Sequence, residues 1–327
     1  MSLLSLPFDE LRERRSLKWR TYAPDVLPMW VAEMDTALHP AVRETLLDAI
    51  DRGDTGYPHG TAYAESFARM AAERWQWMLD VPAQVRRAGD VMNSVLAVLE
   101  ATTAPGDGIV INPPVYPPFR QVVAGYRRNI VEAPLTASGR LDLQTLEAAF
   151  AGPDRPKAYL LCSPHNPTGA VHTAAELEAV LALAATHGVR VIVDEIHACL
   201  VDPGTTFVPA LAVRGGEQAI SVTSAGKAWN LAGFKAGLIV AGAQATDVLA
   251  ALPPLAQQSS GHLANLVHTA ALVKAQDWVD ELMAEIAANK ALLATELARE
   301  LPAARYTAPE GTYLAWVDCS ELGLENP

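Results

Sequence analysis

Cysteine is scarce in this chain of 327 residues. Its three cysteines, Cys162, Cys199 and Cys319, lie far apart and include no Cys-X-X-Cys pair. A disulfide framework and a structural zinc site both need closely matched sets of cysteines, so the sequence argues against both. We expect a protein of a reducing compartment.

Long hydrophobic runs are also missing. The most apolar zones are interrupted by Glu178 and Arg190 in one case and by Lys235 and Asp247 in another. A membrane-spanning helix needs about 18 apolar residues without such interruptions. The first ten residues have no basic segment and reach two acidic residues before an apolar stretch can form, which does not match a signal peptide. We therefore expect a cytoplasmic protein with no membrane partner.

Positive charge is the third shortage. Lysine and arginine number 25 against 37 aspartates and glutamates, so the net charge is −12. A surface this acidic repels phosphate backbones and disfavours nucleic acid as a partner. Half of the residues are hydrophobic, which suits a chain with a large core, and the length predicts about two domains.

Short apolar runs alternate with helical stretches in the middle of the chain. The runs lie at 108–112, 158–162, 190–194, 219–223 and 236–240. They are apolar on both sides rather than alternating, which is typical of strands buried on both faces, and helical patterns such as 173–187 lie between them. The pattern predicts an α/β fold with a mostly parallel sheet flanked by helices.

Three parts of the chain are expected. Residues 1–45 form an N-terminal arm and part of a small domain, 46–260 a large α/β domain, and 261–327 a linking helix and the rest of the small domain. Helices are predicted at 40–53, from 62 toward 77, and at 261–301, and a last strand at 312–318. Because the chain ends soon after that strand, we expect the small α+β domain to be incomplete.

Polar side chains follow the predicted strands where each strand ends. Asp194 closes one run, Asn166 follows another, and Ser224 and Lys227 follow a third. Ligands of open α/β sheets bind at the carboxyl ends of the strands. A lysine that forms a Schiff base with an aldehyde, together with a carboxylate that pairs with a pyridine nitrogen, is typical of pyridoxal 5'-phosphate sites. Ser224 and Lys235 could reach the cofactor's phosphate.

Six motifs strengthen this interpretation. They are LPMWVAEMD at 27–35, GYP at 56–58, NPPVY at 112–116, NPTG at 166–169, DEIH at 194–197 and SAGKAWN at 224–230. With them the chain resembles fold-type I pyridoxal-phosphate enzymes of the class I/II aminotransferase superfamily. Within that superfamily it is similar to the cystathionine β-lyase-like, or MalY/PatB-type, C–S lyases.

The resemblance implies a role for each residue that contacts the cofactor ring. Lys227 would be the Schiff-base lysine and the acid–base group for the Cα proton, and Asp194 would pair with the ring nitrogen. Tyr116 would stack on the ring, Asn166 would donate to the ring hydroxyl oxygen, and His197 would lie beside that oxygen.

The resemblance also implies the phosphate and substrate contacts. The backbone N–H groups of Val91 and Met92 would hold the phosphate, as helix N-termini do for anions. Tyr57 would reach the phosphate of a neighbouring subunit, which makes the expected assembly a homodimer with a shared active site. Trp30 and Ala32, with Asn166, would line the pocket for an amino-acid substrate.

Some positions depart from the family's pattern. Lys235 stands where arginine is common, Gly226 replaces a frequent serine, and no arginine follows Arg305 in the setting that clamps the substrate carboxylate. His197 and Asp194 are too few for a metal site, so none is expected. Three functions stay open: a C–S β-lyase, an aminotransferase, and a cofactor-binding regulatory or inactive protein.

Overall fold

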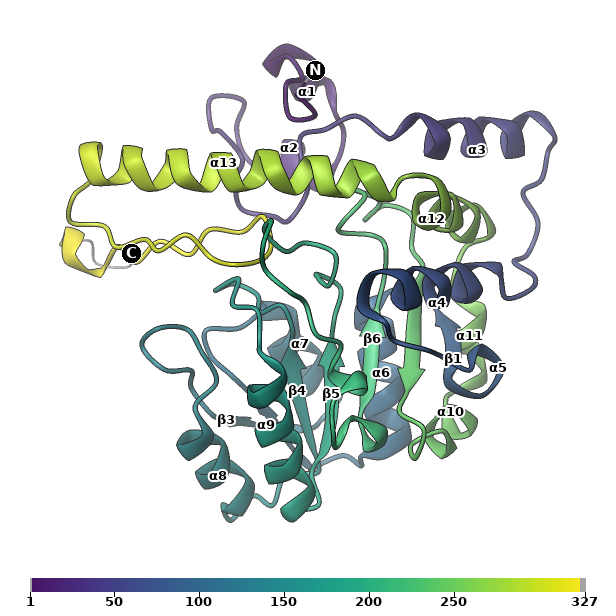
Figure 1. Ribbon diagram of the computed structural model, residues 1–327, viewed down its shortest axis with the longest axis vertical. Coiled ribbons are helices and arrows are strands. Elements are labelled where there is room, and N and C mark those ends of the chain that lie inside the picture. Colours follow the sequence, from purple (N-terminus) through teal and green to yellow (C-terminus); the bar gives the residue numbers. More distant parts are fainter. Residues whose placement is uncertain (1, 324–327) are drawn as a thin grey trace.

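The computed structural model describes residues 2–323 and contains a seven-stranded sheet with helices on both faces (Figure 1). The strands are β1 (Val85–Ala88), β2 (Gly108–Ile111), β3 (Asn129–Glu132), β4 (Ala158–Cys162), β5 (Arg190–Asp194), β6 (Ile220–Thr223) and β7 (Gly237–Ala241). Their spatial order is β1-β7-β6-β5-β4-β2-β3, and only β7 runs antiparallel to its neighbours. The predicted mostly parallel α/β sheet is therefore confirmed.

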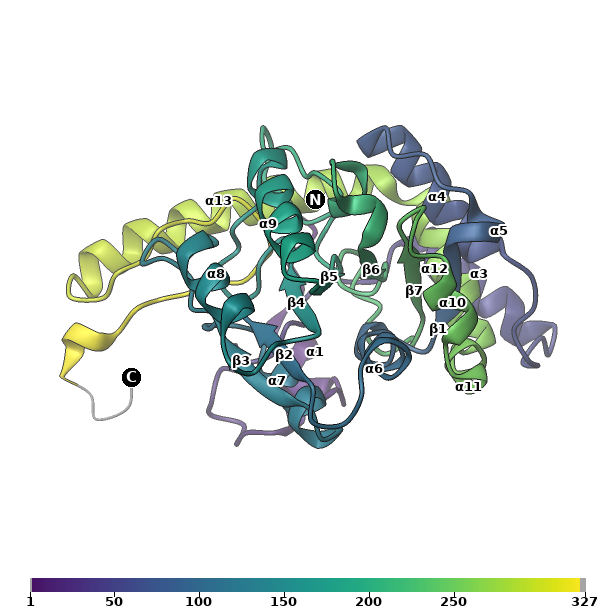
Figure 2. The same cartoon turned by 90° about the horizontal axis from the view of Figure 1, so that it is seen from below.

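Two helical layers explain why the central strands carry apolar residues on both faces. The helices that cover the sheet are α6 (Val91–Thr102) and α7 (Pro117–Gly125) on one face, and α8 (Leu143–Ala151) and α9 (Ala174–Thr186) on the other (Figure 2). Leu160 and Ile192 pack on the α6 side, whereas Tyr159 and Val193 pack on the α9 side. Because successive side chains of a strand point to opposite faces, both faces need apolar residues.

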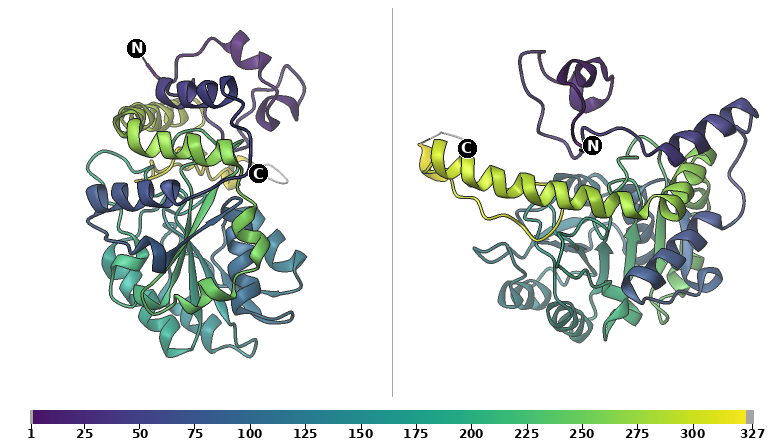
Figure 3. Two further views of the ribbon diagram at one scale, coloured as in Figure 1. Left: turned by 90° about the vertical axis from the view of Figure 1, so that its right-hand side faces the viewer. Right: turned by 45° about the horizontal axis from the view of Figure 1, so that its top comes forward.

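The remaining helices lie at the edges and ends of the sheet. They are α1 (Phe8–Glu13), α2 (Leu17–Arg20), α3 (Pro40–Asp51), α4 (Ala62–Trp75), α5 (Val81–Gln84), α10 (Asp247–Ala251), α11 (Pro254–Gln258), α12 (His262–Lys274) and α13 (Gln276–Glu300), with short 3-10 turns at Ala210–Ala212, Gly216–Gln218 and Ser320–Leu322. The helix predicted at 261–301 is divided into α12 and α13 at Ala275. Figure 3 shows α1 and α2 on the side of α13 that faces away from the sheet.

Two strands were not predicted as apolar runs from the sequence. β1 and β3 are the outer strands of the sheet, and each carries polar or half-exposed residues such as Arg86, Arg87 and Asn129. An edge strand has only one paired side and need not be apolar, so neither strand appears as a hydrophobic run.

The prediction of a strand at 312–318 was wrong. Within residues 2–323 this segment forms only isolated bridge pairs at its margins, between Arg305 and Asp318 and between Val201 and Gly311. A strand needs a ladder of hydrogen bonds to a neighbour, and one pair at a time does not supply it. The segment instead crosses the loops that follow β4 and β5.

The division of the chain into parts at 45/46 and 260/261 stays a prediction. Helix α3 runs across the first of these boundaries and packs against α12, which lies beyond the second. Over residues 2–323, none of the helices combines the length and the apolar character that crossing a bilayer requires.

Candidate active site

The carboxyl ends of three adjacent parallel strands supply the polar residues that the sequence singled out. Asp194 is the last residue of β5, and it pairs with Cys162 of β4 on one side and with Val222 of β6 on the other. The loops after β4 and β6 carry Asn166 and Lys227. Since neighbouring parallel strands end at the same edge, residues from distant parts of the chain meet there.

A cavity of about 190 Å³ opens at this edge. Ten of the twelve residues expected at the site line it: Ala32, Val91, Met92, Tyr116, Asn166, Asp194, His197, Ser224, Lys227 and Lys235. A larger hollow of about 540 Å³ lies at the opposite edge of the sheet, beside Lys157, Arg190 and Glu217, and contains none of them. We take the smaller cavity as the candidate site because its lining holds the groups suited to chemistry.

Lys227 is presented by a tight loop after β6. The loop is closed by hydrogen bonds from Leu231 N to Gly226 O at 2.7 Å and from the buried Trp229 indole to Ala275 O at 2.7 Å. The Lys227 amine donates to Ala32 O at 2.8 Å. Burial lowers the pKa of the Lys227 amine, and the nearby Asp194 carboxylate opposes that decrease.

Asp194 is buried at the floor of the cavity. Its carboxylate accepts one hydrogen bond, from Ile196 N–H to Oδ1 at 3.0 Å, within the part of the chain described here. Burial raises the pKa of Asp194 to about 7, while the Ile196 N–H and the Lys227 charge act against the rise. A cation placed in the cavity would stabilise the charged form of this carboxylate.

His197 and Tyr116, which are expected to contact the cofactor ring, are neutral. Burial lowers the pKa of His197 to about 3, with the Lys227 charge acting in the same direction. His197 Nδ1 is buried and has no hydrogen-bond partner among the described residues. Burial also raises the pKa of Tyr116, whose backbone N–H donates to Asn166 O at 3.1 Å. This hydrogen bond links two residues that are expected to contact the cofactor ring.

One end of the cavity suits an anion. The N–H groups of Val91 and Met92 open helix α6, and we find no acceptor for them within residues 2–323. The Lys235 amine lies 3.1 Å from Asp90, the residue that caps this helix through Asn93 N–H. A helix N-terminus together with a lysine attracts phosphate, although Asp90 now shares that lysine.

Trp30 and Tyr57 are not brought into the cavity. The Trp30 ring packs edge-on against Tyr22 and is 44% exposed, and the Tyr57 side chain is 98% exposed. Their expected roles at the substrate and at a neighbouring subunit's phosphate stay predictions.

The sequence analysis missed two residues at the site. Asp90 lines the cavity, and the Tyr313 hydroxyl donates to Ala32 O at 3.1 Å while its ring packs edge-on against His197. An acidic residue just before a helix predicts an N-cap, which could have drawn attention to Asp90. Tyr313 gave no such signal, since it lies in the segment that was interpreted as a strand.

Pyridoxal phosphate fits these residues. The buried Asp194 has unused acceptor capacity and a raised pKa, so a protonated ring nitrogen would stabilise its charged form. The free N–H groups at the start of α6 lie in the same cavity and suit the phosphate. Lys227 has an amine of lowered pKa there, as a lysine that bonds an aldehyde requires.

Known proteins resemble the chain over almost all of its length. The profile of the family "Aminotransferase class I and II" matches residues 24–325. A Mycobacterium leprae protein named "Putative cystathionine beta-lyase" is 47% identical over 99% of the chain and 82% of that protein. The cystathionine beta-lyase of Corynebacterium glutamicum is 33% identical over 97% of the chain and 85% of its own length.

A solved structure extends the likeness to three dimensions. Cystalysin from Treponema denticola, whose crystal structure contains pyridoxal 5'-phosphate, superposes with a TM-score of 0.88. It is 25% identical, and the match covers 96% of this chain and 83% of cystalysin. The fold and the cofactor that the sequence predicted are thereby confirmed.

Proposed function

Because the chain belongs to the class I and II aminotransferase family, we propose that it is a pyridoxal-phosphate-dependent C–S β-lyase of cystathionine or cysteine S-conjugates. With one molecule of water consumed, the products would be a thiol, pyruvate and ammonia. The observation that carries the proposal is the shared cavity of Lys227 and Asp194, at the ends of adjacent strands, in a chain 47% identical to a protein of the cystathionine β-lyase group.

Each of the chain's own residues has a task in this reaction. Pyridoxal phosphate, when bound, accepts the electrons of the broken Cα–H bond into its ring. Asp194 would hold a proton at the ring nitrogen. Lys227 would hold the aldehyde carbon until the substrate's amine takes its place there, which frees the lysine amine to act as a base. Burial lowers the pKa of the Lys227 amine, which favours its unprotonated form, and the freed amine would then remove the Cα proton. The Cβ–S bond then breaks and the sulfur leaves as a thiolate.

The neighbours of Lys227 orient the reactants. Tyr116 and Asn166 lie on the two loops that flank the cavity and would contact the ring, while Val91, Met92, Ser224 and Lys235 would hold the phosphate. His197 stays neutral and would border the ring hydroxyl oxygen without placing a second positive charge near Lys227. Trp30 and Ala32 would line the substrate pocket with Asn166.

Product analysis tests the proposal. The purified protein, saturated with pyridoxal phosphate, is incubated with cystathionine, and thiol, pyruvate and ammonia are measured. Equal rates for all three, lost in Lys227→Ala, are the expected result. Transfer of the amino group to an added 2-oxo acid, without thiol or pyruvate, would instead identify an aminotransferase. Absence of any turnover by a cofactor-loaded protein would favour the regulatory alternative.

A cytoplasmic homodimer is the assembly we favour. Tyr57, Met29 and Leu27 are largely exposed, and a second copy of the chain would cover such apolar side chains. Sedimentation of the cofactor-loaded protein would measure the mass in solution, and a monomer at micromolar concentration would contradict the dimer. Tyr57→Phe should then weaken phosphate binding in the dimer.

A further inference from the structure

Two donors share one carbonyl oxygen inside the cavity. The Lys227 amine donates to Ala32 O at 2.8 Å, and the Tyr313 hydroxyl donates to the same oxygen at 3.1 Å. Tyr313 belongs to residues 309–313, which we call the strap. Its ring packs edge-on against His197, with 6.1 Å between the ring centres. Burial raises the pKa of Tyr313, so the hydroxyl keeps its proton and remains a donor.

The strap is hydrogen-bonded to two segments that follow strands of the candidate site. Gly311 N–H donates to Gly169 O at 2.9 Å, in the loop after β4, and Thr312 N–H donates to Leu200 O at 2.7 Å, in the segment after β5. The backbones approach so closely that a Cβ at Gly169 would lie 2.5 Å from Pro309 Cβ. Only glycine allows this approach.

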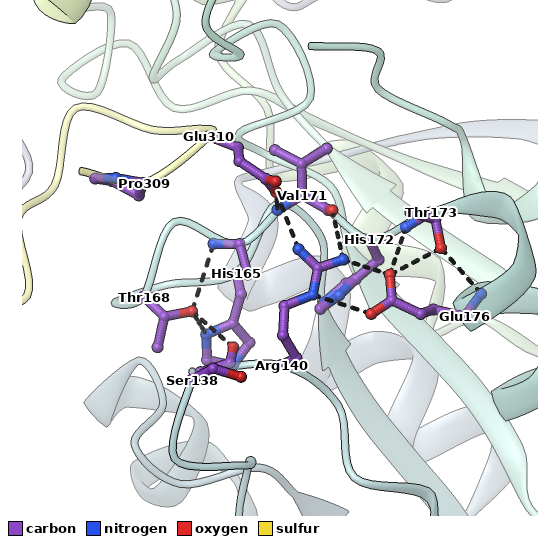
Figure 4. Close-up of polar contacts among 12 residues, drawn as sticks. Ser138, Arg140, His165, Thr168, Val171, His172, Thr173, Glu176, Pro309 and Glu310 are labelled. Carbon is purple, nitrogen blue, oxygen red and sulfur yellow. Dashed lines mark hydrogen bonds and ion pairs between the residues drawn. The ribbon is translucent and has the colours of Figure 1, made fainter. Parts of the chain in front are cut away.

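An ion-pair network includes Glu310 of the strap. Figure 4 shows the Arg140 guanidinium between the carboxylates of Glu176 and Glu310. Arg140 Nη1 lies 2.9 Å from Glu310 Oε2, and Arg140 Nη2 donates to Val171 O at 3.1 Å. Through Glu310, next to Gly311, the strap is thus anchored to Arg140, which in turn contacts the loop after β4 and helix α9.

A lysine of helix α13 also binds the strap. The buried Lys290 amine donates to Pro309 O at 3.2 Å and to Gly311 O at 3.3 Å, and it pairs with Asp202 at 2.6 Å. The strap therefore has little freedom to move, and neither has the tyrosine at its end.

We propose that Tyr313 is a positioning residue, which fixes the Ala32 carbonyl so that this carbonyl orients the Lys227 amine for proton removal from the substrate's Cα. The inference rests on the proposed function for the identity of the proton that is moved. A lysine amine on a flexible four-carbon stem has many orientations. One hydrogen bond to a fixed oxygen leaves far fewer, and proton transfer depends on that orientation.

Removal of a single hydroxyl tests the role. Tyr313→Phe keeps the ring and its packing on His197 but loses the donor to Ala32. Tyr159→Phe is the matched control, because its buried hydroxyl donates at 2.5 Å to Asn112, away from the cavity. Both variants are measured with a full complement of pyridoxal phosphate and also without it.

The first measurement needs no cofactor. Backbone amide exchange of residues 30–35, followed by mass spectrometry, should be faster in Tyr313→Phe and unchanged in Tyr159→Phe, because only the first variant frees the Ala32 segment. Identical exchange of 30–35 in Tyr313→Phe and the parent would overturn the proposal. If Tyr313→Phe does not fold, Glu310→Ala, which loosens the strap, is measured in its place. Amide exchange of residues 30–35 should again be faster than in the parent. Unchanged exchange in Glu310→Ala would likewise overturn the proposal.

The second measurement follows the Cα proton of an amino acid in D₂O by NMR. Tyr313→Phe should exchange this proton about tenfold more slowly, with unchanged cofactor affinity, while Tyr159→Phe exchanges it at the parent's rate. An equally slower Cα proton exchange in both variants would show that Tyr313 contributes only to packing. Exchange without thiol release by the parent would refute the lyase and leave the positioning role intact, so the two failures are distinguishable.

Discussion

Asp194 and Glu195 are adjacent and both buried, yet only Glu195 has its carboxylate fully engaged by the protein. Glu195 accepts from the Ser221 hydroxyl at 2.5 Å and from Ala210 N–H at 2.7 Å. The Asp194 carboxylate accepts from Ile196 N–H alone, among the residues described, and the residue lines the cavity. We infer that Glu195 stabilises the fold and that Asp194 is reserved for a ligand.

Exchanging each carboxylate for its amide separates these two roles. Asp194→Asn should lower activity by at least about 100-fold, because an amide does not hold a proton at the ring nitrogen. Glu195→Gln should keep the cofactor's affinity but lower the free energy of unfolding by about 2 kcal/mol, since glutamine offers one acceptor oxygen to the two donors that Glu195 accepts from. Cofactor titration and urea unfolding measure the two effects. A Glu195→Gln protein that loses the cofactor and keeps its stability would reverse the assignment.

The pH dependence of stability gives an independent test of Asp194. Burial raises its pKa to about 7 in the folded chain, against about 3.9 for an ordinary aspartate. The folded, cofactor-free protein therefore binds more protons than the unfolded chain between those values, and this residue's contribution to stability falls as the pH rises through that window. Asp194→Asn should match the parent near pH 4 and exceed it at pH 7.5 by up to about 4 kcal/mol. Parallel curves for the two proteins in urea unfolding would contradict the burial argument.

His197 should not contribute a step to the pH profile of the reaction. Burial lowers its pKa to about 3, so the ring stays neutral at any pH where the protein works. His197→Gln should change the magnitude of kcat/KM but leave the midpoints of its pH profile in place between pH 5.5 and 9. A midpoint near pH 6.5 that disappears in the variant would show that His197 titrates.

Lys235 should act on the phosphate alone. Its side chain is largely exposed beside the start of α6. Lys235→Ala should weaken pyridoxal phosphate binding about tenfold, consistent with one screened charge-assisted contact, and leave the binding of pyridoxal, which lacks the phosphate, unchanged. Arg214→Ala, which breaks the exposed pair with Glu178 away from the cavity, is the control. An equal loss of affinity for pyridoxal phosphate and for pyridoxal would show that Lys235 does not act through the phosphate.

The buried Lys290–Asp202 pair should stabilise the strap strongly. Lys290→Met leaves a carboxylate and two carbonyls without their donor and should cost about 3 kcal/mol in urea unfolding. The exposed Arg52–Asp48 pair offers a contrast, since Arg52→Ala should cost less than about 0.5 kcal/mol. Similar losses in the two variants would mean that burial of the Lys290 pair does not matter.

The sequence by itself determined the central sheet and most of the candidate site. β2, β4, β5, β6 and β7 are visible as apolar runs because strands buried on both faces are made mostly of apolar residues. The end of a parallel strand is a defined place, so Asp194, Asn166 and Lys227 could be assigned to one edge without coordinates. Their cofactor roles remain predictions, whereas their meeting in one cavity is observed.

Only the tertiary structure decided which distant segments complete the cavity. Tyr313 and Ala32 are 281 residues apart, and no local pattern indicates that one donates to the other. The edge strands β1 and β3, the loss of the strand at 312–318, and the positions of Trp30 and Tyr57 outside the cavity depend equally on the path of the chain. Hydrophobic periodicity records which side of an element is buried, but the partner that buries it is set by the packing of the whole chain.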